Sequence, residues 1–263
     1  MTYKLYANLK NSKIIFEPNA LNGLTNATFH EKIATTNKNV ICKCLRHSRQ
    51  KSEIKTIEKF YNKKIWLVRD PRDRIISAFL YRWYYKHKRS AQKFNETLDT
   101  VLAKEKAPTT IPFYKIIECS FNLNAYIKEE QRIIEDLLNC VKSIQNSWTI
   151  LKYEDFITGN LADLENYLAF DLIKRPKNNF SLNRVKRTTT INNWKNWFTP
   201  ADVDLFKPIF QPVLDFLNYP PDWELNENQI ITKQEASQYL IKINKPERWF
   251  DLLFQKLSFV LRG

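Results

Sequence analysis

The sequence predicts a three-layer α/β fold with a central, mostly parallel sheet flanked by helices, and three observations indicate it. Residues 65–68 form an apolar run too short for a helix, which is typical of a strand buried on both faces. A helical pattern begins at Pro71, with Asp70 as its N-cap and Asp73 three residues later. The β-branched run 148–156 is likewise followed by apolar residues at helical spacing.

The helix that begins at Pro71 has an apolar face that packs on the sheet. Its members recur at helical spacing: Ile75, Ile76, Phe79, Leu80 and Trp83. Three arginines, Arg72, Arg74 and Arg82, need not pack on the sheet. After the later run, Leu161, Leu164, Leu168 and Phe170 predict a second helix of the same kind.

Two further strands are expected nearer the N-terminus. Residues 13–18 suit a strand, and residues 19–26 suit a loop that leads into a helix from about Ala27. Gly23 is one of only three glycines in the chain, which indicates that the backbone needs its conformational freedom there. Residues 39–48 form another apolar run that ends in a polar cluster, as a strand reaching the same sheet edge would.

The length and composition predict one domain over residues 1–263. The chain has 43% hydrophobic residues, enough for a substantial core, and no linker rich in Pro, Gly or Ser divides it. Residues 84–146 are expected to be a mainly helical insertion. Residues 233–263 are expected to form a C-terminal helical extension that docks on the core, mediates dimerisation or rests on a membrane.

Arg69 is placed to bind an anion. Open α/β sheets bind ligands beyond the carboxyl ends of their strands, where Arg69 follows the run 65–68 and precedes a helix N-terminus. Its guanidinium is a rigid fork of donors, and Ser77, eight positions later, can offer a hydroxyl to the same anion. The alternative is a surface ion-pair cluster of charged side chains within residues 70–74.

The segment Val-Arg-Asp-Pro-Arg-Asp-Arg-Ile-Ile-Ser-Ala-Phe, residues 68–79, resembles the 3′-phosphate-binding segment of sulfotransferases. These enzymes use 3′-phosphoadenosine 5′-phosphosulfate (PAPS). The resemblance, closest to bacterial-type carbohydrate sulfotransferases, implies a P-loop NTPase-like sulfotransferase fold in which Arg69 and Ser77 contact the 3′-phosphate. It also implies that Tyr153, in the Tyr-Glu-Asp motif after the later strand, lines the adenine pocket. Without the resemblance, Tyr153 is an ordinary residue at a strand end and residues 154–155 start the next loop.

Two more segments carry the resemblance. Residues 184–187 and the Trp-Lys-Asn-Trp-Phe-Thr-Pro motif at 194–200 look like the family's late basic loop, which implies that Lys186 and Arg187 bind the 3′-phosphate. A flexible basic surface loop is the alternative. The loop after the first strand would hold the 5′-phosphosulfate through Asn22, Gly23, Leu24 and Thr25. It departs from the family in having Leu21 where many relatives have lysine.

The resemblance also suggests a catalytic base. His47 lies 22 positions before Arg69, near where cytosolic relatives carry a catalytic histidine, and its imidazole would accept the proton of the acceptor hydroxyl. Lys43 is the candidate for the charge that steadies the leaving phosphate. Glu17 or Glu53 is the alternative base, as other branches of the family use a carboxylate. The transfer needs no metal and no covalent intermediate.

The net charge of +14 indicates an anionic partner, and the expected acceptor is a hydroxyl or amine of a glycan or glycolipid. A surface rich in lysine and asparagine can also reflect genome base composition. The C-terminal helix is a possible peripheral membrane contact. The four cysteines form no disulfide framework, no metal site is expected, and the lack of an apolar leader or long apolar span predicts a cytoplasmic location.

Competing functions find less support in the sequence. A nucleotide kinase requires a Gly-x-x-x-x-Gly-Lys-Ser/Thr loop, which the chain does not contain. A nucleic-acid-binding protein would explain the charge, but neither zinc-finger spacing nor an RNP-like strand occurs. The alternatives to an active sulfotransferase are an inactive sulfotransferase-like protein that binds the nucleotide alone and a basic nucleic-acid-binding protein. The sequence makes no prediction of oligomeric state.

Overall fold

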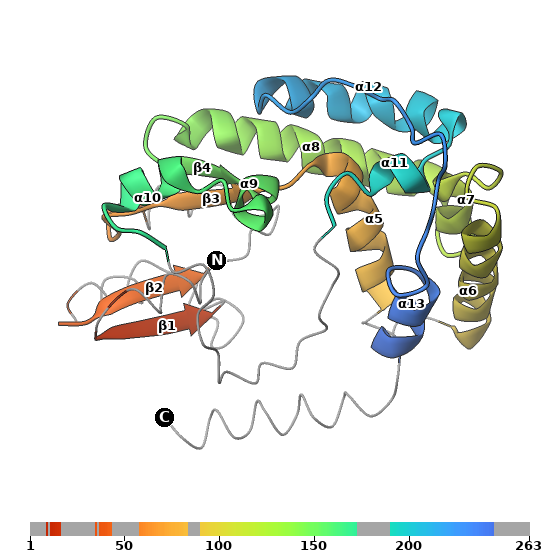
Figure 1. The fold of residues 1–263 in the computed structure, drawn as a ribbon, viewed down its shortest axis with the longest axis horizontal. Helices are drawn as coiled ribbons and strands as arrows, with labels where there is room; N and C mark the ends of the chain where they lie inside the picture. The colour runs from red at the N-terminus through yellow and green to blue at the C-terminus, as the bar shows by residue number, and fades with distance from the viewer. Residues whose placement is uncertain are drawn as a thin grey trace, which may run out of the picture. The chain divides into compact units, whose positions relative to one another are not determined.

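The computed structural model describes residues 9, 11–16, 35, 37–43, 58–83, 90–172 and 190–244 (Figure 1). The chain divides into two compact units, each built from two separate stretches of sequence. The first unit comprises Met1–Asp70 and Gln131–Leu182, and the second comprises Pro71–Glu130 and Asn183–Gly263. The expectation of a single domain over the whole chain stays a prediction.

The first unit holds the strands. Its elements are β1 (Ser12–Phe16), β2 (Asn39–Lys43), β3 (Ile65–Val68), β4 (Thr149–Lys152), α9 (Tyr153–Thr158) and α10 (Ala162–Leu168). The second unit is helical in its described residues: α5 (Pro71–Tyr81), α6 (Ala91–Lys106), α7 (Phe113–Glu118), α11 (Trp194–Trp197), α12 (Pro200–Phe216) and α13 (Ser237–Ile243). The long helix α8 (Leu123–Ile144) begins in the second unit and ends in the first.

The strands form two parallel pairs among the described residues. β1 pairs with β2 from Ser12↔Asn39 to Phe16↔Lys43. β3 pairs with β4 in a register that starts at Ile65↔Thr149 and runs through to residues 68 and 152. The α/β class and the parallel strand direction are therefore confirmed, whereas the described strands do not join into one central sheet.

Strand β3 has the predicted bounds but not the predicted burial. Successive side chains of a strand face opposite sides. Val68 is 3% exposed, whereas Leu67, which faces the other side, is 45% exposed. The expectation that both faces are buried is wrong at Leu67, because no element of the described part of the chain covers this side chain.

The core of the first unit forms between β4 and α10. Its buried members are all leucines: Leu151, Leu161, Leu164, Leu168 and Leu172. Ile41 of β2 and Ile65 of β3 pack against this cluster, so both strand pairs contribute to it. The predicted apolar helix after β4 is confirmed as α10. A turn precedes it, in which Gly159 ends α9 with a φ of 85°, a conformation that glycine adopts without strain.

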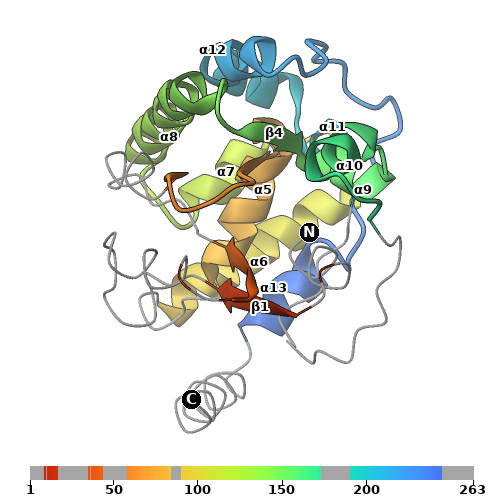
Figure 2. The same cartoon turned by 90° about the vertical axis from the view of Figure 1, so that its left-hand side faces the viewer.

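The core of the second unit is aromatic. Helix α5 contacts α11, α12 and α13, and α13 also contacts α6 (Figure 2). Phe113 of α7 lies at the centre, in ring contact with Phe79, Trp197, Phe198 and Phe206. All five of these side chains are fully buried. Such large aromatic surfaces dominate the energetics of a core.

Two buried charged residues of the second unit, Asp202 and Lys104, form hydrogen bonds with backbone groups. Asp202 accepts hydrogen bonds from the backbone N–H groups of Phe113 at 2.8 Å, Tyr114 at 3.0 Å and Thr199 at 2.8 Å. One carboxylate therefore caps the N-termini of both α7 and α12. Lys104 of α6 is also fully buried and donates through Nζ to the carbonyl oxygens of Pro108 and Ile111.

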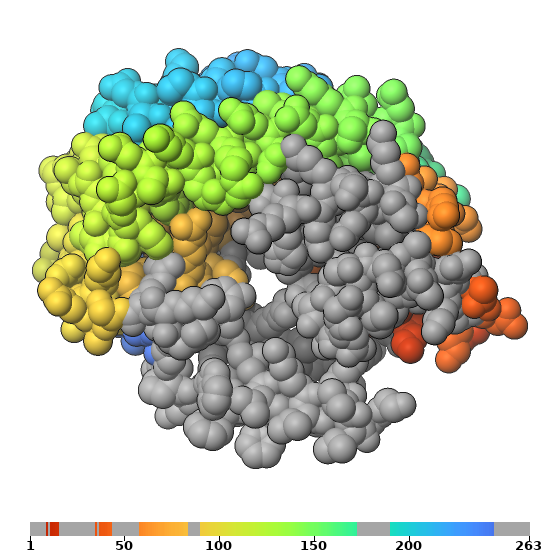
Figure 3. Space-filling model, turned by 180° about the vertical axis from the view of Figure 1, so that it is seen from behind, coloured from red at the N-terminus to blue at the C-terminus, as the bar shows by residue number. Residues whose placement is uncertain are grey.

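Helix α8 is amphipathic along its whole length. Its buried positions, including Tyr126, Glu130, Ile134 and Val141, recur at helical spacing. The opposite side is exposed and charged, with Arg132 and Asp136 forming an i, i+4 ion pair there. This exposed side can be followed in the space-filling view of Figure 3. Glu130 is the one charged residue at a buried position of this helix.

Candidate functional site

The candidate site lies where β3 and β4 end side by side. Val68↔Lys152 is the last pair of the parallel register, and the next residues are Arg69 and Tyr153. The guanidinium carbon of Arg69 lies 4.8 Å from the centroid of the Tyr153 ring. One step further, the backbone N–H of Asp70 donates to Oε1 of Glu154 at 3.0 Å. Two motifs more than eighty residues apart therefore meet in register at one strand edge.

The helix after β4 fixes the position of Tyr153. Lys152 is the N-cap of α9, so Tyr153 is its first residue and Glu154 and Asp155 lie in its first turn. Carboxylates in a first turn are favoured by the positive end of the helix dipole. The alternative reading, in which residues 154–155 start a loop, is wrong. The Glu154 side chain accepts the hydrogen bond from Asp70, two residues after β3. The sequence did not indicate this contact, but the shared register of the two motifs explains it.

Arg69 has no anionic partner among the described residues. Its side chain is half-buried, and its Nε is buried without a hydrogen-bond acceptor. The Glu154 carboxylate accepts from the Asp70 backbone instead. A guanidinium held over an aromatic ring with its donors uncommitted can accept an oxyanion bidentately. The charge and partial burial of Arg69 thus suit a phosphate, sulfate or carboxylate as a partner.

The first turn of α5 is buried rather than exposed. Arg72 is 1% exposed and Asp73 is 3% exposed. Asp73 Oδ1 accepts a 2.8 Å hydrogen bond from the backbone N–H of Trp194, the first residue of α11. The alternative of a surface ion-pair cluster is wrong for these two residues. Arg72 packs against side chains outside the sheet, because the rings of two tryptophans enclose it.

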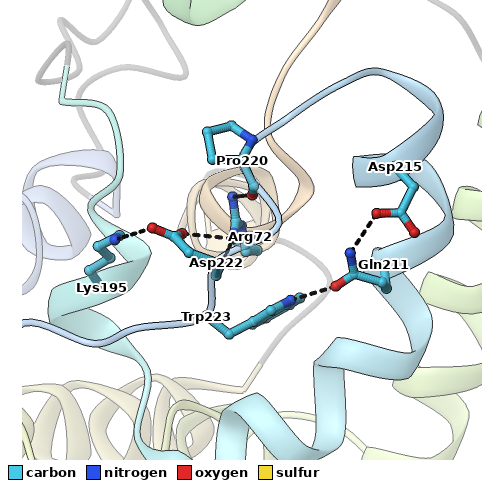
Figure 4. Close-up of polar contacts among 7 residues, drawn as sticks. All are labelled: Arg72, Lys195, Gln211, Asp215, Pro220, Asp222 and Trp223. Atoms are coloured by element: carbon cyan, nitrogen blue, oxygen red, sulfur yellow. Dashed lines mark hydrogen bonds and ion pairs between the residues drawn. The ribbon is translucent and has the colours of Figure 1, made fainter.

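Figure 4 shows the contacts around Arg72. Its guanidinium carbon lies 4.2 Å from the ring centroid of Trp194 and 5.2 Å from that of Trp223. Nη2 donates to the carbonyl oxygen of Pro220 at 3.3 Å, and Nη1 donates to that of Asp222. The Asp222 carboxylate also pairs with Lys195 Nζ at 2.9 Å. Arg72 is therefore a structural residue that joins α5, α11 and the segment after α12.

The remaining predicted site residues divide into two groups. Ser77 is half-buried on α5, and Lys43 is half-buried as the last residue of β2. The others lie outside the described residues: Asn22, Gly23, Leu24, Thr25, His47, Lys186 and Arg187. The alternative bases Glu17 and Glu53, and Leu21, lie outside them as well. The structure therefore joins Arg69 to Tyr153 and leaves the other roles as predictions.

Lys104 is a buried lysine outside this site, and a buried lysine with a lowered pKa can act as a catalytic amine. Burial lowers the pKa of Lys104 to about 8, and the charge of Asp202 opposes that change. Burial also raises the pKa of Asp202, although the backbone N–H groups it caps act in the opposite direction. Because Lys104 Nζ is committed to two carbonyl oxygens and is fully buried, it supports the fold rather than a reaction.

Within the described ranges, no group of three or more His, Cys, Asp or Glu side chains is arranged to hold a metal ion. Over the same residues, every helix is too short or too polar to cross a bilayer. Comparisons with family models, with curated proteins and with solved structures found no match for this chain. The case for function therefore rests on the residues and their geometry.

Proposed function

We propose that the protein is a sulfotransferase that transfers the sulfuryl group of PAPS to a hydroxyl or amine of an acceptor. The observation that carries the proposal is the Arg69 guanidinium, which lies over Tyr153 at the end of a parallel strand and has no anionic partner among the residues that the structure describes. A dianionic phosphate is a strong partner for such a group. The sequence resemblance supplies the identity of the phosphate as the 3′-phosphate of PAPS.

Tyr153 has two roles in this proposal. One face of its ring is covered by Arg69, so the ring orients the guanidinium before the nucleotide binds. The other face or the ring edge would contact the adenine. The roles of Ser77, Lys186 and Arg187 at the 3′-phosphate, and of residues 22–25 at the 5′-phosphosulfate, belong to the proposal and are each testable by alanine substitution.

The proposed reaction is a single in-line displacement at sulfur. A new S–O or S–N bond forms to the acceptor while the bond from sulfur to the bridging phosphate oxygen breaks. His47 would take the proton of the acceptor, and 3′-phosphoadenosine 5′-phosphate leaves with the electron pair of the broken bond. Lys43 would balance the charge that develops on that phosphate. The protein mainly positions two reactants and supplies fixed positive charge.

The proposal also includes the predictions for the detailed fold, the acceptor and the location of the protein. They are a three-layer, P-loop NTPase-like sulfotransferase fold, a glycan or glycolipid acceptor, and a cytoplasmic location. The parallel strands β3 and β4 support this fold, because a helix follows each of them, directly after Asp70 in one case and from Tyr153 in the other. The excess of 42 Lys and Arg over 28 Asp and Glu supports an anionic acceptor.

The deciding experiment measures binding of 3′-phosphoadenosine 5′-phosphate, the product nucleotide, by calorimetry. The wild-type chain should bind it, and Arg69→Ala should weaken binding by about a hundredfold, the loss of a bidentate charged contact. Arg132→Ala removes an equal charge from an exposed side chain and serves as the control. No nucleotide binding by the wild-type chain would refute the proposal.

A second experiment separates binding from catalysis. Release of the product nucleotide from PAPS is followed with a panel of glycan and glycolipid acceptors. His47→Ala should retain nucleotide binding and lose transfer, whereas retained transfer would place the base at Glu17 or Glu53. Nucleotide binding without transfer to any acceptor would favour the inactive, nucleotide-binding alternative.

A further inference from the structure

The side of α5 that remains open to solvent carries a second concentration of positive charge. Seven of the eleven helix residues are buried, and the other four are Arg74, Ser77, Ala78 and Tyr81. Arg82 follows directly and is also partly exposed. This open stripe of α5, residues 74, 77, 78, 81 and 82, includes two arginines and no acidic side chain.

A buried carboxylate lies beneath the two arginines. Glu130 of α8 is fully buried, its Oε2 accepts a hydrogen bond from Arg74 Nη2, and its Oε1 lies 4.0 Å from Arg82 Nη2. Arg74 and Arg82 are eight positions apart in the sequence. Their guanidinium groups thus approach the two oxygens of one carboxylate. The Oε1 atom is buried and has no hydrogen-bond partner among the described residues.

Arg82 is not needed to balance the negative charge of Glu130. Arg74 alone neutralises the carboxylate, whereas Arg82 stays beyond hydrogen-bond distance. Arg82 instead lies over the rings of Phe121 at 5.3 Å and Tyr126 at 4.6 Å. The described part of the chain offers it no hydrogen bond, and its side chain is 32% exposed. A guanidinium fixed on aromatic rings with unused donors is preorganised to receive a ligand.

We propose that Arg74 and Arg82 form a binding site for a tetrahedral oxyanion, a sulfate or phosphate group, with Glu130 positioning the two guanidiniums. The site has a net positive charge of one, because two arginines face one carboxylate. The side chains of Arg74 and Arg82 are 25% and 32% exposed, and the half-buried Ser77 belongs to the same stripe of α5. The site does not include Arg69 and stands whether or not the proposed activity is correct.

Inorganic sulfate is the probe, because it is a dianion at neutral pH. The midpoint of thermal unfolding, Tm, is measured against sulfate concentration, with sodium chloride at matched ionic strength as the reference. Sulfate should raise Tm alike in the wild-type chain and in the exposed control Arg132→Gln, and part of the rise should remain in Arg69→Ala, which loses only the Arg69 anion site. Arg82→Gln should weaken sulfate binding about tenfold or more, the cost of one charge-assisted hydrogen bond.

Two further variants distinguish a binding site from a structural ion pair. Glu130→Gln removes the internal counter-ion while keeping an acceptor oxygen, and sulfate should then bind more tightly. A purely structural cluster would give a lower Tm and no gain in sulfate affinity, which would overturn the proposal. Arg82→Lys keeps the charge but not the fork and should bind sulfate with intermediate affinity, which covers the case in which Arg82→Gln does not fold.

The source of the oxyanion is decided by competition. If 3′-phosphoadenosine 5′-phosphate abolishes the sulfate effect and Arg82→Gln weakens nucleotide binding, the site holds a group of the nucleotide. If nucleotide and sulfate stabilise the chain additively, the site holds a group of the other substrate. A sulfate effect that is unchanged in Arg82→Gln, or lost in Arg69→Ala alone, would refute the site and leave the sulfotransferase proposal untouched. Sulfate binding that depends on Arg82, in a chain that does not bind the nucleotide, would support the site and refute the sulfotransferase proposal.

Discussion

Arg69 lies over the ring of Tyr153, with its guanidinium carbon 4.8 Å from the ring centroid, one residue beyond the last pair of the β3–β4 register. The parallel register itself produces this contact, because equal steps past Val68 and Lys152 lead to these two side chains. A tyrosine at this place can therefore orient the arginine without any hydrogen bond to it.

Replacing Tyr153 tests that orienting role. Tyr153→Ala should weaken binding of 3′-phosphoadenosine 5′-phosphate by about three- to thirtyfold, since a cation–π contact contributes ~0.5–2 kcal/mol. Tyr153→Phe keeps the ring and should bind within about twofold of wild type. Calorimetry measures both, and Tyr167→Phe, also a loss of one tyrosine hydroxyl in the first unit, is the control. Equal loss in the Ala and Phe variants would contradict a role for the ring face.

Arg72 is expected to matter for stability rather than for binding. Arg72→Met leaves two carbonyl oxygens without their donor and the Asp222 carboxylate with Lys195 alone, at a cost of about 3 kcal/mol in the free energy of unfolding. Arg72→Lys should restore little, because an ammonium cannot stack between two tryptophans or reach both carbonyl groups. Urea denaturation gives the values. Lys195→Met, which removes a partly exposed ion pair with Asp222, should cost about 0.5 kcal/mol.

The sequence predicted the elements at this site because local signals define them. The apolar run 65–68 and Pro71 at the helix start are both read from neighbours along the chain, and β3 and α5 begin where they indicate. Arg69 was identified from its place between a strand and a helix start, and Tyr153 only through the resemblance. Their contact depends on the register of strands more than eighty residues apart, which no local pattern determines.

What the sequence could not reveal is which charged residues are buried. Arg72, Glu130 and Asp202 are fully buried, yet nothing in their local spacing separates them from exposed charges. Arg72 is buried because two tryptophans from the segment after residue 190 close over it. Similarly, Leu67 belongs to an apolar run but is exposed, since burial is decided by what packs on the strand.

Asp202 is predicted to couple two helices. Asp202→Ala leaves the N-termini of α7 and α12 uncapped and should lower the free energy of unfolding by about 2–4 kcal/mol, the cost of one to two caps. Asp202→Asn keeps one carbonyl oxygen as an acceptor and should cost roughly half as much. Urea denaturation compares both with Asp204→Ala, which alters a non-capping position on the same helix. A loss no larger than that of Asp204→Ala would show that the caps are not coupled.

Lys104 should make the stability of the chain depend on pH in the alkaline range. Burial lowers its pKa from 10.5 to about 8 in the folded state, so between these values the unfolded chain binds the additional proton. The free energy of unfolding therefore rises with pH between about 8 and 10.5, by at most ~3 kcal/mol for this group. The raised pKa of Asp202 acts only at acid pH, where stability falls as pH rises. Urea denaturation at pH 7 to 10 should show a shallower rise in Lys104→Met than in wild type, and parallel curves would refute this assignment.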